Sequence, residues 1–156
     1  RGEHHLAFSV GGREMTCRVL EGSFPDYERV IARGNDKKAV VGTKALAEAV
    51  RRVAIMTGDR NRGVRLEFGN QEVSIAAANP DLGDASESLP CEISGGSVKL
   101  GLNPDYLGHF LDAVETAKVH LELKDENSQC VGSPVADEGQ EATGERYLCV
   151  IMPMRI

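Results

Sequence analysis

The chain has 156 residues, of which 41% are hydrophobic and 27% are charged, and its formal net charge is −6. This length allows one ordinary domain with a sizeable core, or one domain plus a fragment of another. The negative net charge excludes a protein that coats nucleic acid with a uniformly basic surface, although it leaves room for a local basic stripe.

The sequence carries no signal for a membrane, a metal or a cofactor. No apolar run approaches the length of a membrane span and no signal-peptide pattern opens the chain, so we expect a cytoplasmic protein. Because residue 1 is Arg1 and not Met, we expect the chain to continue from something longer. The four cysteines lie far apart, which favours reduced thiols over a zinc site; they are Cys17, Cys91, Cys130 and Cys149.

The first segment predicts a β-hairpin that ends a preceding domain. Apolar residues alternate on both sides of a Gly11-Gly12 turn, as expected for two antiparallel strands. Such a hairpin is not stable alone, so it belongs with other strands. The polar stretch that follows, with Gly34 and Asn35 near its end, predicts a connector between domains.

From about residue 38 the pattern predicts one strand-helix-strand unit and then a second. The first begins with a strand at Ala39–Val41, followed by a helix that we expect Thr43 to cap. Its apolar face is spaced for a helix, and two alternating strands follow; the apolar positions are Leu46, Ala47, Val50, Val53 and Ala54, then Val64, Leu66 and Phe68, then Val73, Ile75 and Ala77.

The second unit begins with Val98, Leu100 and Leu102 on a strand, and Asn103-Pro104 predicts a capped helix start. The helix face and the next strand follow, at Leu107, Phe110, Leu111 and Val114, then Val119, Leu121 and Leu123. The segment 147–152 is almost continuously apolar, which predicts a strand buried on both faces. Residues 133–144 are rich in Ala, Glu, Gly and Asp, and we expect them to form an exposed loop.

The two units predict an α+β fold with internal duplication, in which two helices cover one face of a shared antiparallel sheet. Signatures of catalysis are weak. The segment 58–63 has the outer spacing of a phosphate loop, but the required Lys-Ser/Thr pair does not follow it. A small hydrolase or transferase assembled in space, for instance from Cys149 and a histidine, stays open as an alternative.

Two surface features point beyond the core. Lys44, Arg51 and Arg52 lie opposite the apolar face of the first helix, where they form either a solvated face or a contact with phosphate groups. Ile55 lies on the same polar side, which indicates a frayed helix end or an interface. Nearby, the carboxylates of Asp81, Asp84 and Glu87 cluster at a loop and strand start.

Several segments together resemble the bacterial DNA sliding clamp family, the β subunit of DNA polymerase III. They cover nearly the whole chain in the family's order, and they are residues 20–30, Arg62–Leu66, Asn79-Pro80, Asn103 with Tyr106, and Met152-Pro153-Met154-Arg155-Ile156. The resemblance implies a DNA-clamp fold. It implies that residues 1–24 end the second clamp domain, 25–37 connect, and 38–156 form the third domain.

The same resemblance implies a non-enzymatic processivity factor without a cofactor. Two subunits would close into a homodimeric ring around double-stranded DNA, near the nucleoid and away from membranes. The replicative polymerase, the clamp loader and repair proteins would dock short peptides in a pocket. By matched position that pocket includes Pro25, Arg29, Val30, Asn103, Tyr106, Val150, Met152, Pro153, Met154 and Arg155.

The resemblance also gives the two surface features a role. Lys44, Arg51 and Arg52 would face DNA, whereas the second helix presents Asp105, His109 and Asp112, which departs from a simple basic lining. The subunit interface would include Ile55, Met56, Asp81, Asp84 and Glu87. A domain that binds peptides or proteins but never DNA is a further alternative.

Overall fold

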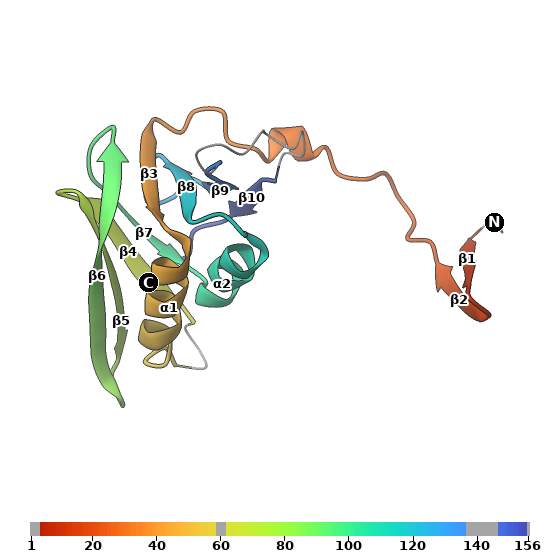
Figure 1. Cartoon of the computed structure of the whole chain (residues 1–156), viewed down its shortest axis with the longest axis horizontal. Coiled ribbons are helices and arrows are strands. Elements are labelled where there is room, and N and C mark those ends of the chain that lie inside the picture. The colour runs from red at the N-terminus through yellow and green to blue at the C-terminus, as the bar shows by residue number, and fades with distance from the viewer. Residues whose placement is uncertain (1–3, 59–61, 137–146, 156) are drawn as a thin grey trace.

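In the computed structural model, residues 4–58, 62–136 and 147–155 are described. An N-terminal hairpin pairs β1 (His5–Val10) with β2 (Arg13–Arg18), in antiparallel register with Phe8 opposite Met15. Its turn needs glycine because Gly11 and Gly12 adopt φ of 57° and 76°, a region that residues with a side chain rarely occupy. Figure 1 shows the hairpin standing apart from the other strands.

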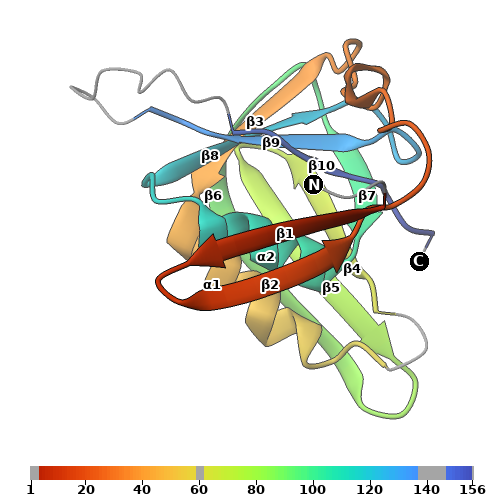
Figure 2. The same cartoon turned by 90° about the vertical axis from the view of Figure 1, so that its right-hand side faces the viewer.

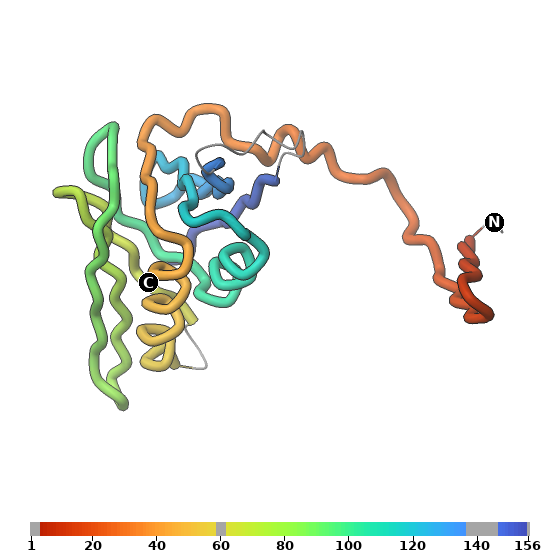
Figure 3. Tube along the Cα trace, in the orientation of Figure 1, coloured from red at the N-terminus to blue at the C-terminus, as the bar shows by residue number. Residues whose placement is uncertain are grey.

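An extended connector leads from the hairpin to the main domain (Figure 3). It contains one short 3-10 helix, η1 (Tyr27–Arg29). Most of its side chains are exposed, including Phe24 at 85% and Leu20 at 91%. Apolar side chains left in water over such a length indicate a segment that packs against something else.

The main domain consists of two halves with the same order of elements, strand-helix-strand-strand-strand. The first half is β3 (Lys37–Gly42), α1 (Thr43–Ala54), β4 (Val64–Gly69), β5 (Glu72–Asn79) and β6 (Gly83–Ser94). The second is β7 (Val98–Leu102), α2 (Pro104–Ala113), β8 (Lys118–Leu123), β9 (Cys130–Pro134) and β10 (Cys149–Ile151). The duplicated α+β fold expected from the sequence is confirmed.

The strands form one antiparallel sheet in the order β10-β9-β8-β3-β6-β5-β4-β7. Each half lends its first strand to the other half, because β3 pairs with β8 and β7 pairs with β4. The strand β6 pairs with β5 through Gly83–Pro90 and with β3 through Cys91–Ser94, so it joins the β10-β9-β8-β3 part of the sheet to the β5-β4-β7 part. Figures 1 and 2 show α1 and α2 side by side within the curve of this sheet.

The core lies between the helices and the inner face of the sheet. The apolar positions expected for both helices are buried, among them Leu46, Val50, Leu107 and Phe110. Alternate strand residues point to the same core, including Leu66, Ile75 and Leu121. Since each fully buried side chain of this size contributes about 1.5–3 kcal/mol, this shared core holds the two halves together.

The start of α1 differs from the expectation. Gly42 is the N-cap residue and Thr43 is the first helical residue, so the prediction that Thr43 caps the helix was wrong. The reason is that Thr43 is used elsewhere. Its Oγ1 donates to the Thr116 carbonyl at 2.7 Å and its backbone N–H donates to the Ala117 carbonyl at 2.9 Å, which ties α1 to the segment between α2 and β8.

The C-terminal strand also differs. Only Cys149–Ile151 form β10, and Tyr147, Leu148 and Met152 are 42%, 45% and 61% exposed, so a strand buried on both faces was wrong. The physical reason is its place at the edge of the sheet, where it pairs with β9. The expected loop 133–144 begins later than predicted because β9 includes Ser133 and Pro134, and residues 137–146 lie outside the described residues.

Candidate functional site

The C-terminal tail folds back onto β7 after leaving β10. Met154 forms an isolated antiparallel bridge with Gly101, and its N–H donates to the Gly101 carbonyl at 2.8 Å. In the duplicated architecture this bridge is the counterpart of the pairing between β6 and β3. The bridge therefore holds the last residues of the chain beside the end of β7, in the same way that β6 pairs with β3 in the first half.

The beginning of α2 lies next to this bridge, because Asn103 follows Gly101 by two residues. The Asn103 Oδ1 accepts the Asp105 N–H at 2.8 Å, and Pro104 occupies the first helical turn, so the predicted helix start is confirmed. One position further on, Tyr106 is 61% exposed. The fixed helix start thus presents an aromatic side chain to solvent near the tail.

The connector reaches the same end of the domain by a different route. The Gln129 Nε2 donates to the Val30 carbonyl at 3.2 Å, and Gln129 immediately precedes Cys130, which pairs with Ile151 of β10. The Gln129 side chain therefore connects Val30 to the start of β9, next to the β9–β10 pair. Pro25 and Arg29 are exposed, and Arg29 forms an ion pair with Asp26 at 2.9 Å within the connector itself.

The ten residues expected to form a peptide pocket thus divide into two groups. In the first group, the bridge between Met154 and Gly101 brings the C-terminal residues close to the start of α2. This group comprises Asn103, Tyr106, Val150, Met152, Pro153, Met154 and Arg155. Val30 is tied to the β8–β9 turn beside them, whereas Pro25 and Arg29 lie further back along the exposed connector. Met152 and Tyr106 are the most exposed apolar side chains of the first group, each at 61%.

The basic face of α1 is largely paired with carboxylates. Arg51 forms an ion pair with Asp112 of α2, and Arg52 binds both carboxylate oxygens of Glu87 in β6 at 2.8 Å. Hydrogen bonds from Arg52 hold the pKa of Glu87 below its ordinary value and raise the pKa of Arg52. The Lys44 Nζ lies 4.0 Å from the Glu48 Oε1. The predicted lining therefore presents cations whose charge is partly balanced on the domain itself.

These carboxylate partners were not foreseen from the sequence. Asp112 was noted only as a departure from a basic lining, and Glu87 was placed with an acidic rim. The sequence contains no signal for either pair because 61 positions separate Arg51 from Asp112 and 35 separate Arg52 from Glu87. Only the packing of α1 against α2 and β6 brings them within reach.

The residues expected at a subunit interface gather along one side of the domain. Ile55, which follows the last residue of α1, is 73% exposed. The Met56 Cε lies 3.8 Å from the position that a Cβ on Gly83 would occupy, so Met56 touches the β5–β6 turn between Asp81 and Asp84. The first part of β6 pairs with β5 alone among the described residues, so one edge of Gly83–Pro90 carries unpaired backbone groups.

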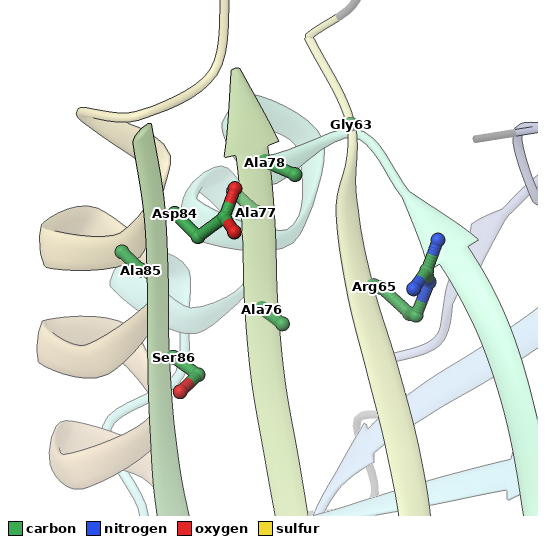
Figure 4. Close-up of a pocket in the computed structure, with 8 residues that line it drawn as sticks. All are labelled: Gly63, Arg65, Ala76, Ala77, Ala78, Asp84, Ala85 and Ser86. Carbon is green, nitrogen blue, oxygen red and sulfur yellow. The ribbon is translucent and has the colours of Figure 1, made fainter. Parts of the chain in front are cut away.

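A hollow of about 340 Å³ lies on the outer face of the sheet, over β4, β5 and β6 (Figure 4). Small side chains line most of it, with Asp84 and Arg65 as its charged groups; the other lining residues are Gly63, Ala76, Ala77, Ala78, Ala85 and Ser86. The sequence did not indicate this hollow. It lies on the side of the sheet away from the helices.

Cys130 and Cys149 lack the surroundings of a nucleophile. Burial raises the pKa of Cys149, and burial together with the nearby Cys149 raises the pKa of Cys130 to about 12. A catalytic thiol needs the opposite shift, because the thiolate is the reactive form.

The part of the chain that the structure describes contains no group of three or more His, Cys, Asp or Glu that could hold a metal ion. Within the same residues, no helix is long and apolar enough to cross a membrane.

The comparisons with known proteins identify the family. The family described as "DNA polymerase III beta subunit, C-terminal domain" matches residues 28–155, which is most of the chain. The chain belongs to this family. The resemblance seen in the sequence is therefore confirmed, and so is the sliding-clamp fold.

Several curated relatives match nearly the whole chain. The beta sliding clamp of Pseudomonas aeruginosa is 36% identical and that of Escherichia coli is 31% identical, each over 99% of this chain and 40% of the relative. The chain therefore spans about two fifths of the length of the curated relatives that it matches.

Solved structures of this family superimpose closely. The DNA polymerase III subunit beta from Pseudomonas aeruginosa matches with a TM-score of 0.86 and 35% identity, over 99% of this chain and 41% of that one. A sliding clamp from Bartonella birtlesii, bound to griselimycin, also has a TM-score of 0.86, at 28% identity, over 99% of this chain and 40% of its own. Sliding clamps of this family thus bind ligands in solved structures.

Proposed function

We propose that the protein is a sliding clamp, a non-catalytic processivity factor of DNA replication that works in the cytoplasm at the nucleoid. It would encircle duplex DNA as a ring and tether the replicative polymerase and other partners. The observation that carries the proposal is the family match over residues 28–155. The raised thiol pKa values argue against the alternative of a thiol-dependent hydrolase or transferase.

The partner site would be formed by the C-terminal tail, the start of α2 and the connector. The bridge between Met154 and Gly101 supports this assignment because it keeps the tail beside Asn103 and Tyr106. Exposed apolar side chains with a few polar groups suit a short peptide that carries Leu or Phe anchors. Methionine side chains adapt to different partners, which suits a site shared by the polymerase, the clamp loader and repair proteins.

Peptide binding to the full-length protein tests this site. A fluorescent peptide with Leu and Phe anchors should bind the wild-type protein and lose affinity in the Met154→Ala and Tyr106→Ala variants. Truncation of a central apolar contact costs more than about 1 kcal/mol, which corresponds to an affinity loss of about fivefold or more. The control is Leu148→Ala, which removes another exposed apolar side chain near β10. Equal affinities in all variants would reject the pocket.

The face of α1 would contact DNA without reading its sequence. A clamp must slide, so its cations should meet phosphates weakly and uniformly. The ion pairs of Arg51 and Arg52 support weak contact, since Asp112 and Glu87 already balance part of their charge. The same pairs also favour the second candidate function, a domain that binds proteins but never DNA.

Charge reversal separates these two functions. Replacing Arg51 and Arg52 by Glu in the full-length protein should reduce its retention on circular duplex DNA, while peptide affinity should not change. The difference in DNA retention between the wild type and this variant should be larger at low salt, because phosphate contacts release counterions. If loading and sliding are unaffected, the lining role of α1 is wrong and the protein-only function gains support.

The partner subunit would meet the side formed by Ile55, Met56 and the acidic start of β6. An exposed isoleucine at the end of a helix suits an apolar contact. The unpaired edge of Gly83–Pro90 offers backbone groups to a second strand. Asp81, Asp84 and Glu87 would face basic residues of the partner subunit, although Glu87 already binds Arg52.

A further inference from the structure

We propose that Gln129 is a positioning residue for peptide binding, because its side chain fastens the connector to the strand pair that carries the C-terminal tail. This inference rests on the proposed peptide site and adds to it a residue that does not contact the peptide. Its basis is a set of hydrogen bonds that join the connector to the end of β8 and the start of β9, which lie far from it in the sequence.

The first bond joins Gln129 to the connector. The Gln129 Nε2 donates to the Val30 carbonyl at 3.2 Å, across 99 positions of sequence. On its other side, Gln129 continues directly into β9, where Cys130 is opposite Ile151. Ile151 directly precedes Met152. Gln129 therefore links Val30 of the connector to the strand pair from which the C-terminal tail leaves, and both segments contribute residues to the proposed site.

Asn35 adds a second attachment from the other end of the connector. Its Nδ2 donates to the Glu122 carbonyl at 2.8 Å and to the Gln129 carbonyl at 3.1 Å. One amide group thus spans the end of β8 and the start of β9. Gln129 takes part in both attachments, as a donor through its side chain and as an acceptor through its backbone.

The turn between β8 and β9 is rigid enough to serve as an anchor. The Asp125 Oδ1 accepts the backbone N–H groups of Asn127 at 3.0 Å and Ser128 at 2.8 Å. These donors lower the pKa of Asp125, so its carboxylate stays charged near neutral pH and keeps accepting them. Gln129 directly follows Ser128, so these hydrogen bonds also help to fix the position of its backbone.

The connector needs such an anchor because it is otherwise exposed. Val30 is 45% exposed and Tyr27 is 62% exposed, so little apolar burial holds this segment in place. Among the described residues, the hydrogen bonds from 25–35 to the rest of the domain are those of Gln129 and Asn35. Losing the Gln129 side chain would let Val30 move away from the tail, and peptide binding would then have to order the connector again.

Peptide affinity measured on the full-length protein tests the inference. Gln129→Ala removes the donor, and Gln129→Glu keeps the shape but faces the Val30 carbonyl with an acceptor. Both should weaken the fluorescent Leu/Phe peptide about three- to tenfold, the range expected for one net hydrogen bond. The matched control is Asn127→Ala, which removes an exposed amide from the same turn and should leave affinity unchanged.

A second readout separates positioning from general destabilisation. Hydrogen exchange of residues 28–33 should accelerate in Gln129→Ala, while exchange of the amides in β3 and β8 stays at the wild-type rate. This measurement needs no peptide and is valid as long as the strands remain protected. If the strands also lose protection, Asn35→Ala is measured in the same way, because it releases the connector without changing β9.

The outcomes are distinguishable from failure of the peptide site. If Met154→Ala weakens binding but both Gln129 variants bind like the wild type, the peptide site stands and the positioning role of Gln129 is overturned. If connector exchange does not change in Gln129→Ala, the anchor is overturned whatever the peptide does. If Met154→Ala, Tyr106→Ala and the wild type bind equally, the peptide site is rejected and the inference falls with it.

Discussion

Arg52 and Glu87 form a two-point ion pair, with the guanidinium Nε and Nη2 each 2.8 Å from a different carboxylate oxygen. The pair joins α1 to β6 and links two surfaces that the sequence assigned to separate tasks, DNA contact and subunit contact. A change at either surface therefore acts on the other. A second subunit that draws Glu87 away would release a cation on the proposed DNA face.

The pair predicts a pH-dependent contribution to stability. Arg52 holds the pKa of Glu87 below its ordinary value of 4.5. A carboxyl group with a lowered folded-state pKa stabilises the fold above its unfolded value, and the contribution is lost as the pH falls through the lowered pKa. Glu87→Gln should therefore lower the unfolding midpoint at neutral pH, and its difference from the wild type should shrink below pH 4.5.

Thermal unfolding between neutral and acid pH checks this prediction. Arg52 is exposed and Glu87 is partly exposed, so the shift in the unfolding midpoint should be small and should decrease with added salt. Glu72→Gln serves as the control, because this exposed residue at the start of β5 forms no ion pair in the part of the chain that the structure describes. A wild-type advantage over Glu87→Gln that persists at the acid end would contradict the prediction.

A glycine at the β6–β7 turn should be irreplaceable. A Cβ on Gly95 would lie 2.3 Å from the Asp36 carbonyl oxygen and 2.9 Å from the Lys37 Cα, both backbone atoms that cannot move aside. Its neighbour Gly96 has a similar φ of +96° but open space around a Cβ. Gly96→Ala should cost about 1–2 kcal/mol from backbone strain, and Gly95→Ala about 1–3 kcal/mol more from the clash.

Denaturant unfolding of the two variants measures this difference directly. Because both carry the same substitution at positive φ, the strain largely cancels between them and the clash remains. Equal free energies of unfolding would mean that the start of β3 yields to the extra methyl group. The expected outcome is that Gly95→Ala is clearly the less stable of the two.

A second glycine supports the aromatic packing over β9. A Cβ on Gly132 would lie 2.8 Å from Cε1 and Cζ of Phe110, whose ring is 1% exposed and stacks on Tyr147 with centroids 5.9 Å apart. The ring has no free space, so Gly132→Ala should destabilise the domain by about 1–3 kcal/mol. Gly108→Ala, on α2 with nothing within 4 Å, should instead stabilise it by about 0.4–1 kcal/mol.

The free energy of unfolding and the near-ultraviolet circular dichroism test this pair of variants. Gly132→Ala should also alter the aromatic signal, because the Phe110–Tyr147 stack must shift to admit the methyl group. Gly108→Ala should leave that signal unchanged. A neutral Gly132→Ala would indicate that the ring can rotate away without loss.

The exposed Ile55 should matter for assembly and not for folding. Its side chain is 73% exposed, so Ile55→Ala should change the free energy of unfolding by less than about 0.5 kcal/mol. In the full-length protein, the same change should weaken self-association about fivefold or more, as for a central apolar contact. Sedimentation velocity over a dilution series measures the association.

Leu148→Ala is the control for this assembly test. It removes an apolar side chain that is 45% exposed and directly precedes β10 in the second half of the domain, whereas Ile55 follows α1 in the first half. Its dissociation profile should match the wild type. A protein that associates equally well with and without Ile55 would place the subunit contact elsewhere.

Much of the fold was predictable because side-chain spacing alone specifies it. The helical spacing of Leu46, Val50 and Val53 and the Asn103-Pro104 start identified α1 and α2. In contrast, only a strand start was expected near Glu87, and the twelve-residue extent of β6 was missed, because Asp84, Glu87 and Pro90 have low strand propensity. Pairing with β5 and β3 makes this segment a strand, and such long-range pairing leaves no local pattern.

The candidate site was predictable only through the family resemblance. Spacing predicted Met152 as the last residue of a strand, with Met154 after it, but not that the tail returns to Gly101. The ion partners of Arg51 and Arg52 and the anchors of Val30 depend on contacts between distant elements. Polar residues such as Gln129 and Asn35 carry no periodic pattern, so their role emerges only once the chain is folded.

The double pairing of β6 also bears on how the domain comes apart. Gly83–Pro90 complete the edge of β5, while Cys91–Ser94 cover β3. If β6 left the sheet, β3 would lose its neighbour on one side, and β3 is also the strand on which β8 of the second half pairs. The duplicated halves therefore form one cooperative folding unit, despite their repeated architecture, and neither should persist as a separate intermediate.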